Sequence, residues 1–214
     1  MEINGKRLYQ TPSGSKVASV TTILSQTKSQ ESIDALNNWR NRVGHQAAAA
    51  TTKEAAGVGT RMHKMLEEHI LGTSTPPGTN LVHQQAHSMA QQIIQKGLSK
   101  ASAIWGVEVP VYYPELYAGT TDSVGVWTNK ETIIDYKQTN RPKKREYIDD
   151  YFLQLAGYSA AHNEVYGSNI RQGVILMCSR ACEYQEFVLE GSEFDKYTNL
   201  WWNRVERYYR ENDK

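Results

Sequence analysis

The chain has 214 residues, with 24 basic and 23 acidic side chains and a formal net charge of +1. This length suits one sizeable core in one domain. Because these charges nearly cancel, the net charge does not indicate a nucleic-acid partner, and any such binding must come from local patches. No apolar run reaches membrane-spanning length and the first residues lack a signal-peptide core. Two cysteines, Cys178 and Cys182, suit a reducing compartment without a disulfide framework, so we expect a soluble, cytoplasmic protein.

The first hundred residues are expected to be mainly helical. Residues 1–18 contain short polar, turn-like pieces and form either a small hairpin or a loose arm, and residues 19–24 are expected to pack on the core. Over residues 31–43, apolar side chains recur at helical spacing, which predicts an amphipathic helix. Its Trp39 is expected in the core rather than against a nucleobase. Further helices are predicted over residues 45–71, as one helix or a pair, and over residues 81–100.

The helical segment over residues 45–71 carries a histidine and a glutamate on one face. His63 and Glu67 are four positions apart, a spacing that brings side chains together along a helix. A histidine on a helix is usually a surface or structural residue, and imidazole suits Mn²⁺ and Zn²⁺ better than Mg²⁺. Glu67 would either orient His63 or be solvated. On this spacing alone, a metal-binding role for His63 is the weaker of the two interpretations.

A β-hairpin is predicted further along the chain, after an edge strand over residues 103–113 that contains Pro110. Two runs rich in β-branched and aromatic residues, 117–127 and 132–139, flank the turn-like residues 128–131. If the loop is residues 129–130 or residues 128–131, position 124 faces 135 and position 122 faces 137. Because side chains alternate between the faces of a strand, Asp122, Asp135 and Lys137 then project from one face. A loop of odd length would turn Asp135 and Lys137 to the opposite face.

These three charged side chains predict a metal site. Two neighbouring carboxylates raise each other's pKa unless a positive group lies between them, and Mg²⁺ is commonly held by one or two carboxylates plus substrate phosphate. A lysine beside such a site can steer an attacking water or help to deprotonate it. The alternative is that Asp122 and Asp135 merely flank a turn and that Lys137 is a solvated edge charge. Asp135-Tyr136-Lys137 is the only acid-x-Lys triplet in the chain and it follows two isoleucines, which favours the site.

A basic loop and a helix follow the hairpin. The loop carries Arg141, Lys143, Lys144 and Arg145, which would either contact the phosphates of a nucleic acid or simply be solvated. The helix, from about residue 151 to 166, places Gln154 and Tyr158 on one face. The remaining predicted elements are a fully buried, parallel strand over residues 172–178, a further strand over residues 183–189 and a terminal helix over residues 194–209.

Five motifs, taken in order, resemble the RecB-type branch of the PD-(D/E)XK nucleases. Gly119-Thr-Thr-Asp122, Ile133-Ile-Asp135-Tyr-Lys137 and Gln154-Leu-Ala-Gly-Tyr158 match its series G-x-x-D, D-x-K and Q-x-x-x-Y. Upstream, Gly59-Thr-Arg-Met-His63 resembles the helical G-x-x-x-H segment of that branch. The opening over residues 19–24, followed by Trp39, is similar to the mitochondrial genome maintenance exonucleases and their phage relatives. The resemblance spans roughly residues 19 to 160.

The resemblance implies an α/β fold with a restriction-endonuclease-like core, in which a mixed sheet has flanking helices and an N-terminal helical extension. One nuclease domain would span residues 1–214. It would consist of a mainly helical part over residues 1–102, a catalytic sheet and crossover helix over residues 103–190, and a terminal helix over residues 191–214.

The resemblance also implies roles for individual residues. The metal ligands for Mg²⁺ or Mn²⁺ would be His63, Asp122, Asp135 and the backbone carbonyl of Tyr136, with Glu108 as a lower-ranked candidate. Lys137 would position the attacking water, and Gln154 and Tyr158 would face the site. Some relatives carry an iron–sulfur cluster on four cysteines, and the two cysteines of this chain do not supply its ligands.

The function implied is a Mg²⁺- or Mn²⁺-dependent deoxyribonuclease, an exonuclease acting on DNA ends or single strands in DNA replication, repair or recombination. The alternatives are a structure-specific endonuclease of the same fold and a non-catalytic DNA-binding module. Degenerate members of such families typically lose an acid or the lysine, whereas Asp122, Asp135 and Lys137 are all present here. The sequence has no P-loop, so no nucleotide cofactor is expected, and no membrane partner is expected either. A phage-encoded protein of this kind would act in the cytoplasm of the host cell.

Overall fold

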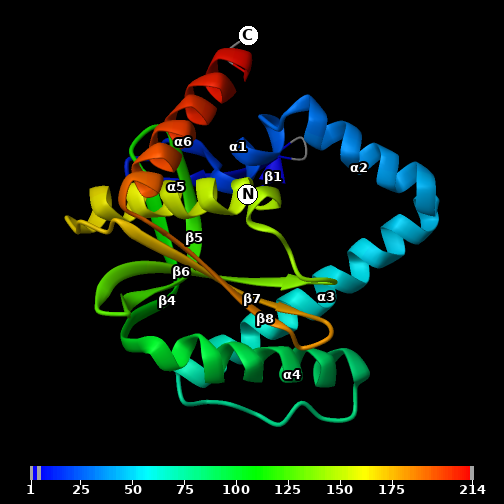
Figure 1. Cartoon of the computed structure of the whole chain (residues 1–214). Helices are drawn as coiled ribbons and strands as arrows, with labels where there is room; N and C mark the ends of the chain where they lie inside the picture. Colours follow the sequence, from blue (N-terminus) through cyan, green and yellow to red (C-terminus); the bar gives the residue numbers. More distant parts are fainter. Residues whose placement is uncertain (1, 4–5, 213–214) are drawn as a thin grey trace.

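The structure, a computed structural model, describes residues 2–3 and 6–212 and consists of a mixed sheet with helices on both faces (Figure 1). The strands are β1 (Glu2–Ile3), β2 (Lys6–Gln10), β3 (Lys16–Ser19), β4 (Ala101–Tyr113), β5 (Tyr117–Trp127), β6 (Lys130–Thr139), β7 (Gln172–Ser179) and β8 (Tyr184–Glu190). The α-helices are α1 (Val20–Gln26), α2 (Gln30–Val43), α3 (His45–Ile70), α4 (Leu81–Lys96), α5 (Asp149–Tyr166) and α6 (Gly191–Asn212). Two 3₁₀ turns, η1 (Leu98–Lys100) and η2 (Arg145–Tyr147), precede β4 and α5.

Strand β5 connects the two parts of the sheet. It pairs with the edge strand β4 along its length, whereas on its other side its first residues pair in parallel with β3 and its last five pair with β6. Beyond β6 the order continues through β7, which is parallel to β6, to β8. Helix α5 makes the crossover between the parallel strands β6 and β7, as such a pair requires. The α/β fold class with a mixed sheet and flanking helices is thereby confirmed, and β4 lies at an edge of the sheet, as Pro110 indicated.

The N-terminal residues contribute strands as well as helices. Strands β2 and β3 form a hairpin, with Leu8 opposite Ala18, so of the two alternatives for residues 1–18 the hairpin is the one observed in the described part. Residues 1, 4 and 5 lie outside the described residues. Strand β3 extends the main sheet, and α1 packs on the core through Val20, Ile23 and Leu24. In the described part of residues 1–102, strands β1 to β3 thus accompany helices α1 to α4.

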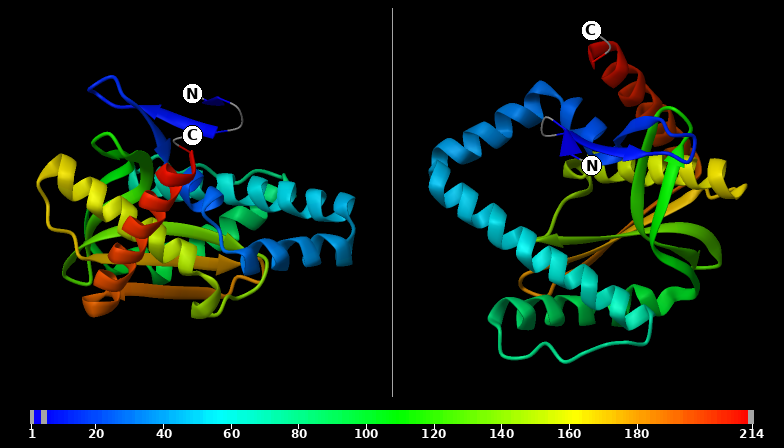
Figure 2. Two further views of the ribbon diagram at one scale, coloured as in Figure 1. Left: turned by 90° about the horizontal axis from the view of Figure 1, so that it is seen from above. Right: turned by 180° about the vertical axis from the view of Figure 1, so that it is seen from behind.

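Two apolar cores lie on opposite faces of the sheet (Figure 2). One core contains residues of α1, α5 and α6 packed against the sheet, among them Phe152 and Trp201. The other contains residues of α3 and α4, among them Met62 and Ile93, packed against β6 and β7. The predicted buried strand is confirmed, because every residue of β7 is buried. Among the described helices, none combines the length and the apolar character needed to cross a membrane.

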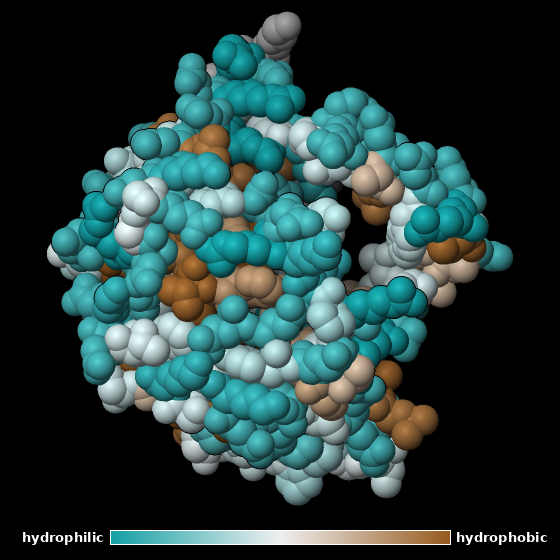
Figure 3. Space-filling view, viewed as in Figure 1, coloured by the Kyte–Doolittle hydropathy of each residue, from teal (hydrophilic) through white to brown (hydrophobic). Residues whose placement is uncertain are grey.

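Helix α2 and the adjoining half of α3 form an arch that stands away from the sheet (Figures 1 and 2). Figure 3 shows an opening between this arch and the rest of the molecule. No residue of α2 is buried, although Ile33, Leu36 and Val43 recur at helical spacing, and each is about 40% exposed. The expectation that Trp39 lies in the core is wrong, because its helix packs mainly against α3 and it is only half-buried. Periodicity identified the helix but could not show what its apolar face meets.

Two glycines provide a matched test of this packing. A Cβ at Gly125 of β5 would lie 2.1 Å from the carbonyl oxygen of Ala103, a backbone atom that cannot rotate away. Gly125→Ala is therefore expected to lower the free energy of unfolding by about 3 kcal/mol. A Cβ at Gly57 of α3 meets nothing within 4 Å, so Gly57→Ala is expected to raise it by about 0.5–1 kcal/mol. Urea unfolding of both variants checks the pair, and equal stabilities would contradict the described β4–β5 packing.

Candidate functional site

Strands β5 and β6 separate at the position of the predicted site. Their pairing runs from Trp127 opposite Lys130 to Ser123 opposite Ile134. Continued by one position, the register places Asp122 opposite Asp135, and there the backbone N–H of Tyr136 donates to Oδ2 of Asp122 at 2.7 Å. The Asp122 carboxylate thus accepts a hydrogen bond that a backbone carbonyl of the neighbouring strand would accept in a continuous ladder. We call this separation the fork; it admits side chains from both faces of the sheet.

The turn of the hairpin differs from the prediction. It consists of Thr128 and Asn129, which have φ values of 46° and 65°, rather than of residues 129–130 or 128–131. Positive φ at both central residues matches the twist of a hairpin, and asparagine tolerates it. The register consequently moves by two positions, and Asp122 faces Asp135 instead of Lys137. Because side chains repeat every two residues, the shift keeps Asp122, Asp135 and Lys137 on one face.

Asp135 is a buried carboxylate paired with Lys137. Its side chain is 2% exposed, and its Oδ2 lies 2.5 Å from Nζ of Lys137. Its Oδ1 accepts no hydrogen bond from any described residue. Burial, opposed by Lys137 and reinforced by Asp122, raises the pKa of Asp135 to about 6. An orphaned, buried carboxylate oxygen costs free energy, which a bound cation would recover.

Lys137 is a protonated ammonium at neutral pH. Burial acts to lower its pKa, but Asp135 and Asp122 outweigh burial and raise the pKa of Lys137 above its ordinary value. The ring of Tyr151, on the first turn of α5, lies 5.0 Å from Nζ. Tyr151 is not among the residues predicted for the site, although its position three residues before Gln154 on the same helix could have indicated it.

Asp122 and His63 meet across the fork. Nδ1 of His63 lies 3.4 Å from Oδ1 of Asp122. Burial acts to lower the pKa of His63, but the Asp122 carboxylate outweighs this effect and raises it. Burial likewise acts to raise the pKa of Asp122, while His63, Lys137 and the Tyr136 N–H lower it. Asp122 is therefore ionised at neutral pH, and the long helix α3 brings to it the imidazole that the family resemblance, rather than the helical spacing, indicated.

Glu108 lies in the same cluster. The register of β4 and β5, with Val107 opposite Ser123 and Val109 opposite Thr121, places Glu108 opposite Asp122. Ligand atoms of Glu108, Asp122 and His63 all lie within 4.8 Å of one another. Glu108 has a φ of 48°, a conformation that non-glycine residues adopt rarely and often at functional sites. Across β4, β5 and β6, three acids thus occupy consecutive strands.

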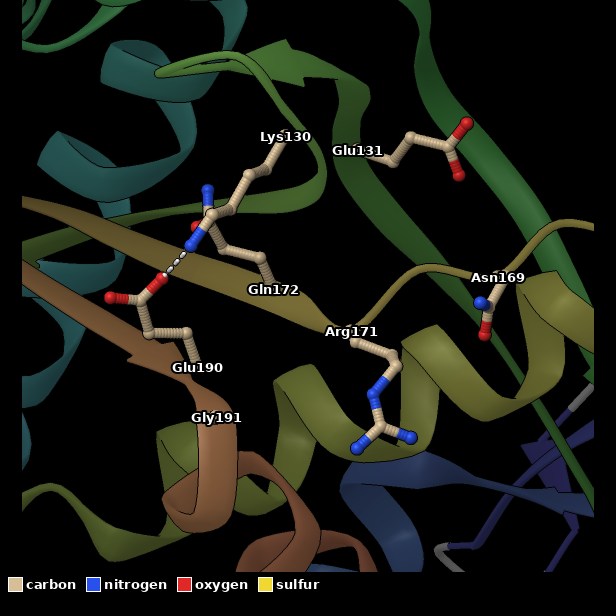
Figure 4. A pocket seen from close by; sticks show the side chains of 7 residues that line it. All are labelled: Lys130, Glu131, Asn169, Arg171, Gln172, Glu190 and Gly191. Atoms are coloured by element: carbon tan, nitrogen blue, oxygen red, sulfur yellow. Dashed lines mark hydrogen bonds and ion pairs between the residues drawn. The ribbon is translucent and has the colours of Figure 1, made fainter.

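A surface hollow of about 550 Å³ opens over this cluster, lined by Gly59, Thr60, His63, Lys64, Glu67 and Glu108. Glu67 pairs with Lys64 at 3.1 Å rather than with His63. Its described partner is thus Lys64, so the structure gives no support to an orienting role of Glu67 for His63. A second hollow of about 510 Å³ lies at the turn end of the hairpin (Figure 4). Its Lys130 and Glu190 neutralise each other at 2.5 Å, and none of the motif residues lines it, so we assign the site to the fork.

Helix α5 supplies the remaining motif residues. Nε2 of Gln154 donates to the hydroxyl of Tyr158 at 3.1 Å, and the Tyr158 ring packs where a Cβ at Gly119 would lie, 2.6 Å from its Cε1. The absence of a side chain at Gly119 therefore admits the ring. Burial and the Asp135 carboxylate raise the pKa of Tyr158, which keeps its hydroxyl a hydrogen-bond donor. The ring is buried, so Tyr158 both packs and reaches toward the acids.

The four cations of the basic loop have different surroundings. Arg145 is engaged within the protein, since its guanidinium contacts Glu193 and the carbonyl of Val188 and lies 4.4 Å from the Phe152 ring. Lys144 forms an exposed pair with Glu146 at 3.7 Å. The side chains of Arg141 and Lys143 are exposed. Arg145 therefore holds the loop against the protein, whereas the side chains of Arg141, Lys143 and Lys144 are exposed.

The residues at the fork fit a hard divalent cation. The ligand atoms of His63, Glu108 and Asp122 lie within 4.8 Å of one another, and they combine carboxylate oxygens of the kind that Mg²⁺ and Mn²⁺ prefer with an imidazole suited to Mn²⁺. The Asp135 carboxylate is not one of this group, and its contact is with Lys137. The buried Oδ1 of Asp135 accepts no hydrogen bond from a described residue, and a bound cation would give it a partner.

Known proteins resemble this chain in sequence and in fold. No family model matches the sequence. Mitochondrial genome maintenance exonuclease 1 of Xenopus tropicalis is 27% identical over 215 residues, which cover 92% of this chain and 59% of that protein. The Mus musculus protein of the same name is 28% identical over 204 residues, covering 90% and 59%. The chain thus spans less than two thirds of the length of these relatives.

A solved structure from Eubacterium rectale, described as an exonuclease, has a TM-score of 0.52 and 14% identity to this chain. The match covers 72% of this chain and 65% of that one, and it shows a shared fold. The two kinds of likeness support the recognition made from the motifs: the chain is similar in sequence to the mitochondrial genome maintenance exonucleases, and it shares the fold of the Eubacterium rectale structure.

Proposed function

We propose that this protein is a divalent-metal-dependent DNA exonuclease that hydrolyses phosphodiester bonds at DNA ends or on single strands. The observation that carries the proposal is the fork, where Asp122 and Asp135 face each other and a buried oxygen of Asp135 has no described partner. The relatives that carry the name exonuclease support the same activity. A role in DNA replication, repair or recombination is part of the proposal.

Asp122, Asp135 and His63 would hold Mg²⁺ or Mn²⁺, with the carbonyl of Tyr136 and the carboxylate of Glu108 as further ligands. When bound, such a cation neutralises charge on phosphoryl oxygens and lowers the pKa of a water. The protein supplies the rest of the site: two acids held opposite each other by the strand register, and a histidine held against them by α3.

Lys137 would act as a cation rather than as a proton acceptor, because its carboxylate neighbours keep it protonated. Its ammonium would donate a hydrogen bond to the attacking water or to a phosphoryl oxygen. In the hydrolysis, the water oxygen bonds to phosphorus, the bond to the leaving sugar oxygen breaks, and a proton ends on that oxygen. Gln154 and Tyr158 would orient the phosphate or the water from the α5 side.

The arch supports a substrate with a free end or a single strand. Its opening lies beside α3, the helix that carries His63 (Figures 1 and 3). A strand that reached the fork would pass the exposed cations Arg141, Lys143 and Lys144, which hold a phosphate backbone without reading its sequence. No base-reading domain is required for such contacts.

The test uses end-labelled single- and double-stranded oligonucleotides, each blocked at one terminus, and a circular single strand. With Mg²⁺ or Mn²⁺ the protein is expected to shorten the open substrates from an unblocked end and to spare the circle, and a chelator is expected to stop cleavage. Cutting of the circle would identify an endonuclease instead. Binding without cleavage under every metal condition would identify a non-catalytic module.

His63 provides a separate test of the metal site. His63→Ala is expected to weaken Mn²⁺ binding at least about tenfold, because it removes the imidazole beside Asp122. His69→Ala, on an exposed part of the same helix, is the matched control and should bind Mn²⁺ like the parent protein. Isothermal titration with Mn²⁺ measures both, and equal affinities for the two variants would remove His63 from the ligand set.

The cytoplasmic location stays a prediction. The relatives that match carry the word mitochondrial in their names, and this describes those proteins. Fractionation of cells that express the tagged chain would test the location directly.

A further inference from the structure

The loop between β6 and α5, residues 140–148, is held in one conformation by contacts along its length. The amide of Gln185 accepts from the backbone N–H of Lys143 at 2.7 Å and donates to its carbonyl at 2.9 Å. At one end, the hydroxyl of Thr139 donates to the carbonyl of Arg141 at 2.7 Å. At the other end, Arg145 is fixed by Glu193 and Ile148 is buried. The loop is therefore a rigid platform.

This platform exposes an aromatic ring. Tyr147 is 71% exposed, although its neighbour Ile148 is buried. Among the described residues, no hydrogen bond of its hydroxyl and no contact of its ring with another ring or cation occurs. An aromatic side chain left in water on a rigid loop contributes little to folding. The same loop exposes Arg141, Lys143 and Lys144, and its one acid, Glu146, is followed by Asp149 and Asp150 at the start of α5. The ring therefore lies on a loop that has more basic than acidic side chains.

Both ends of the loop are tied to the candidate site. The loop begins after Thr139, two residues beyond Lys137 on β6. It ends at α5, whose first turn carries Tyr151 with its ring 5.0 Å from Nζ of Lys137. Tyr147 precedes Tyr151 by four residues, and the backbone N–H of Tyr151 donates to the carbonyl of Ile148 at 2.9 Å. Tyr147 therefore lies just before α5 and four residues before the residue that contacts the lysine.

We propose that Tyr147 is a stacking platform for one nucleobase of the strand whose phosphodiester enters the fork, with Arg141, Lys143 and Lys144 contacting the adjacent phosphates. This inference rests on the proposed function and adds a strand-binding residue to it. Proteins that bind single strands combine a basic surface with aromatic rings, and stacking tolerates any base because every base has a π-face. A rigid loop lowers the ordering cost of such a contact. The surrounding cations favour a nucleic acid over an apolar protein partner.

The binding experiment uses the full chain carrying Asp135→Asn, so that the strand is not cut, and a fluorescently labelled single-stranded oligonucleotide. Adding Tyr147→Ala is expected to weaken binding by about 5- to 100-fold, the range for the loss of one base–aromatic stack. Tyr147→Phe keeps the ring and is expected to bind within about twofold of the parent. Tyr166→Ala is the matched control, since Tyr166 is 54% exposed at the other end of α5, and it should leave binding unchanged. Unchanged binding by Tyr147→Ala, or an equal loss with Tyr147→Phe, would overturn the proposal.

An abasic scan locates the contact. A single abasic position is moved along the oligonucleotide. The protein with Tyr147 is expected to lose affinity when the abasic site reaches one particular position, whereas the affinity of Tyr147→Ala should not change there. The same loss in both proteins at every position would overturn the proposal that Tyr147 stacks on a base.

In the protein that retains Asp135 and can cleave DNA, Tyr147→Ala is expected to raise KM with little change in kcat, the signature of lost ground-state binding. If the parent cleaves DNA and Tyr147→Ala matches it in every assay, only the stacking proposal fails; if the parent neither binds nor cleaves DNA, both proposals fail.

Discussion

Replacing Asp135 by asparagine is expected to reduce metal-dependent cleavage at least about a thousandfold. The amide keeps the shape of the side chain but removes the negative charge that faces Asp122 across the fork. It also leaves Lys137 without the carboxylate that lies 2.5 Å from its ammonium. Initial rates on an end-labelled single strand, with Mg²⁺ and then Mn²⁺, measure the loss.

The loss should occur without unfolding. Burial raises the pKa of Asp135 from 3.8 to about 6, so the folded state binds this proton more tightly than the unfolded chain does. Stability from this group is therefore present at low pH and is lost as pH rises from about 4 to about 6. Asparagine avoids the cost of a buried charge at neutral pH, and thermal unfolding is expected to stay within a few degrees of the parent. Asp195→Asn, an exposed acid paired with Arg171, is the control and should cleave normally; rapid cleavage by pure Asp135→Asn would contradict the assignment.

Replacing Lys137 by alanine is expected to lower cleavage at pH 7 by at least about a hundredfold and to change its pH dependence. Lys137 holds the pKa of Asp135 below the value that burial alone would give. Without the ammonium, the pKa of Asp135 rises beyond about 6, and a larger share of the carboxyl is protonated at pH 7. The residual activity should therefore increase as the pH is raised from 6 to 9.

Rates across this pH range, for the parent, Lys137→Ala and Lys130→Ala, check the prediction. Lys130 is an exposed lysine at the hairpin turn, paired with Glu190, and its replacement should leave both rate and profile unchanged. A Lys137→Ala protein with the parent's profile would show that Lys137 does not control the ionisation of Asp135.

The sequence was informative where a pattern has one physical interpretation. Alternation along the two strands placed Asp122, Asp135 and Lys137 on one face, and a two-residue error in the turn did not disturb this result because side chains repeat every two residues. Helical spacing placed Gln154 and Tyr158 together, and they are hydrogen bonded. The buried strand β7 was equally clear from its continuous apolar run.

The remaining features depend on long-range contacts that no local pattern encodes. The turn at Thr128 and Asn129 could have been identified from the tolerance of asparagine for positive φ, but the neighbouring threonine obscured it. The fork depends on where β5 leaves β6 for β3, which only the assembled sheet determines. Trp39 showed the same limit, since helical spacing predicts an apolar face but not a partner to cover it.

The most direct test of the account is Mn²⁺ binding by the parent protein and by a variant carrying both Asp122→Asn and Asp135→Asn, followed by electron paramagnetic resonance. The account predicts that the parent depletes the signal of free Mn²⁺ and that the double variant, folded as judged by circular dichroism, leaves it unchanged. Equal depletion by both proteins would place the metal elsewhere, and no depletion by either would mean that the fork does not capture the ion.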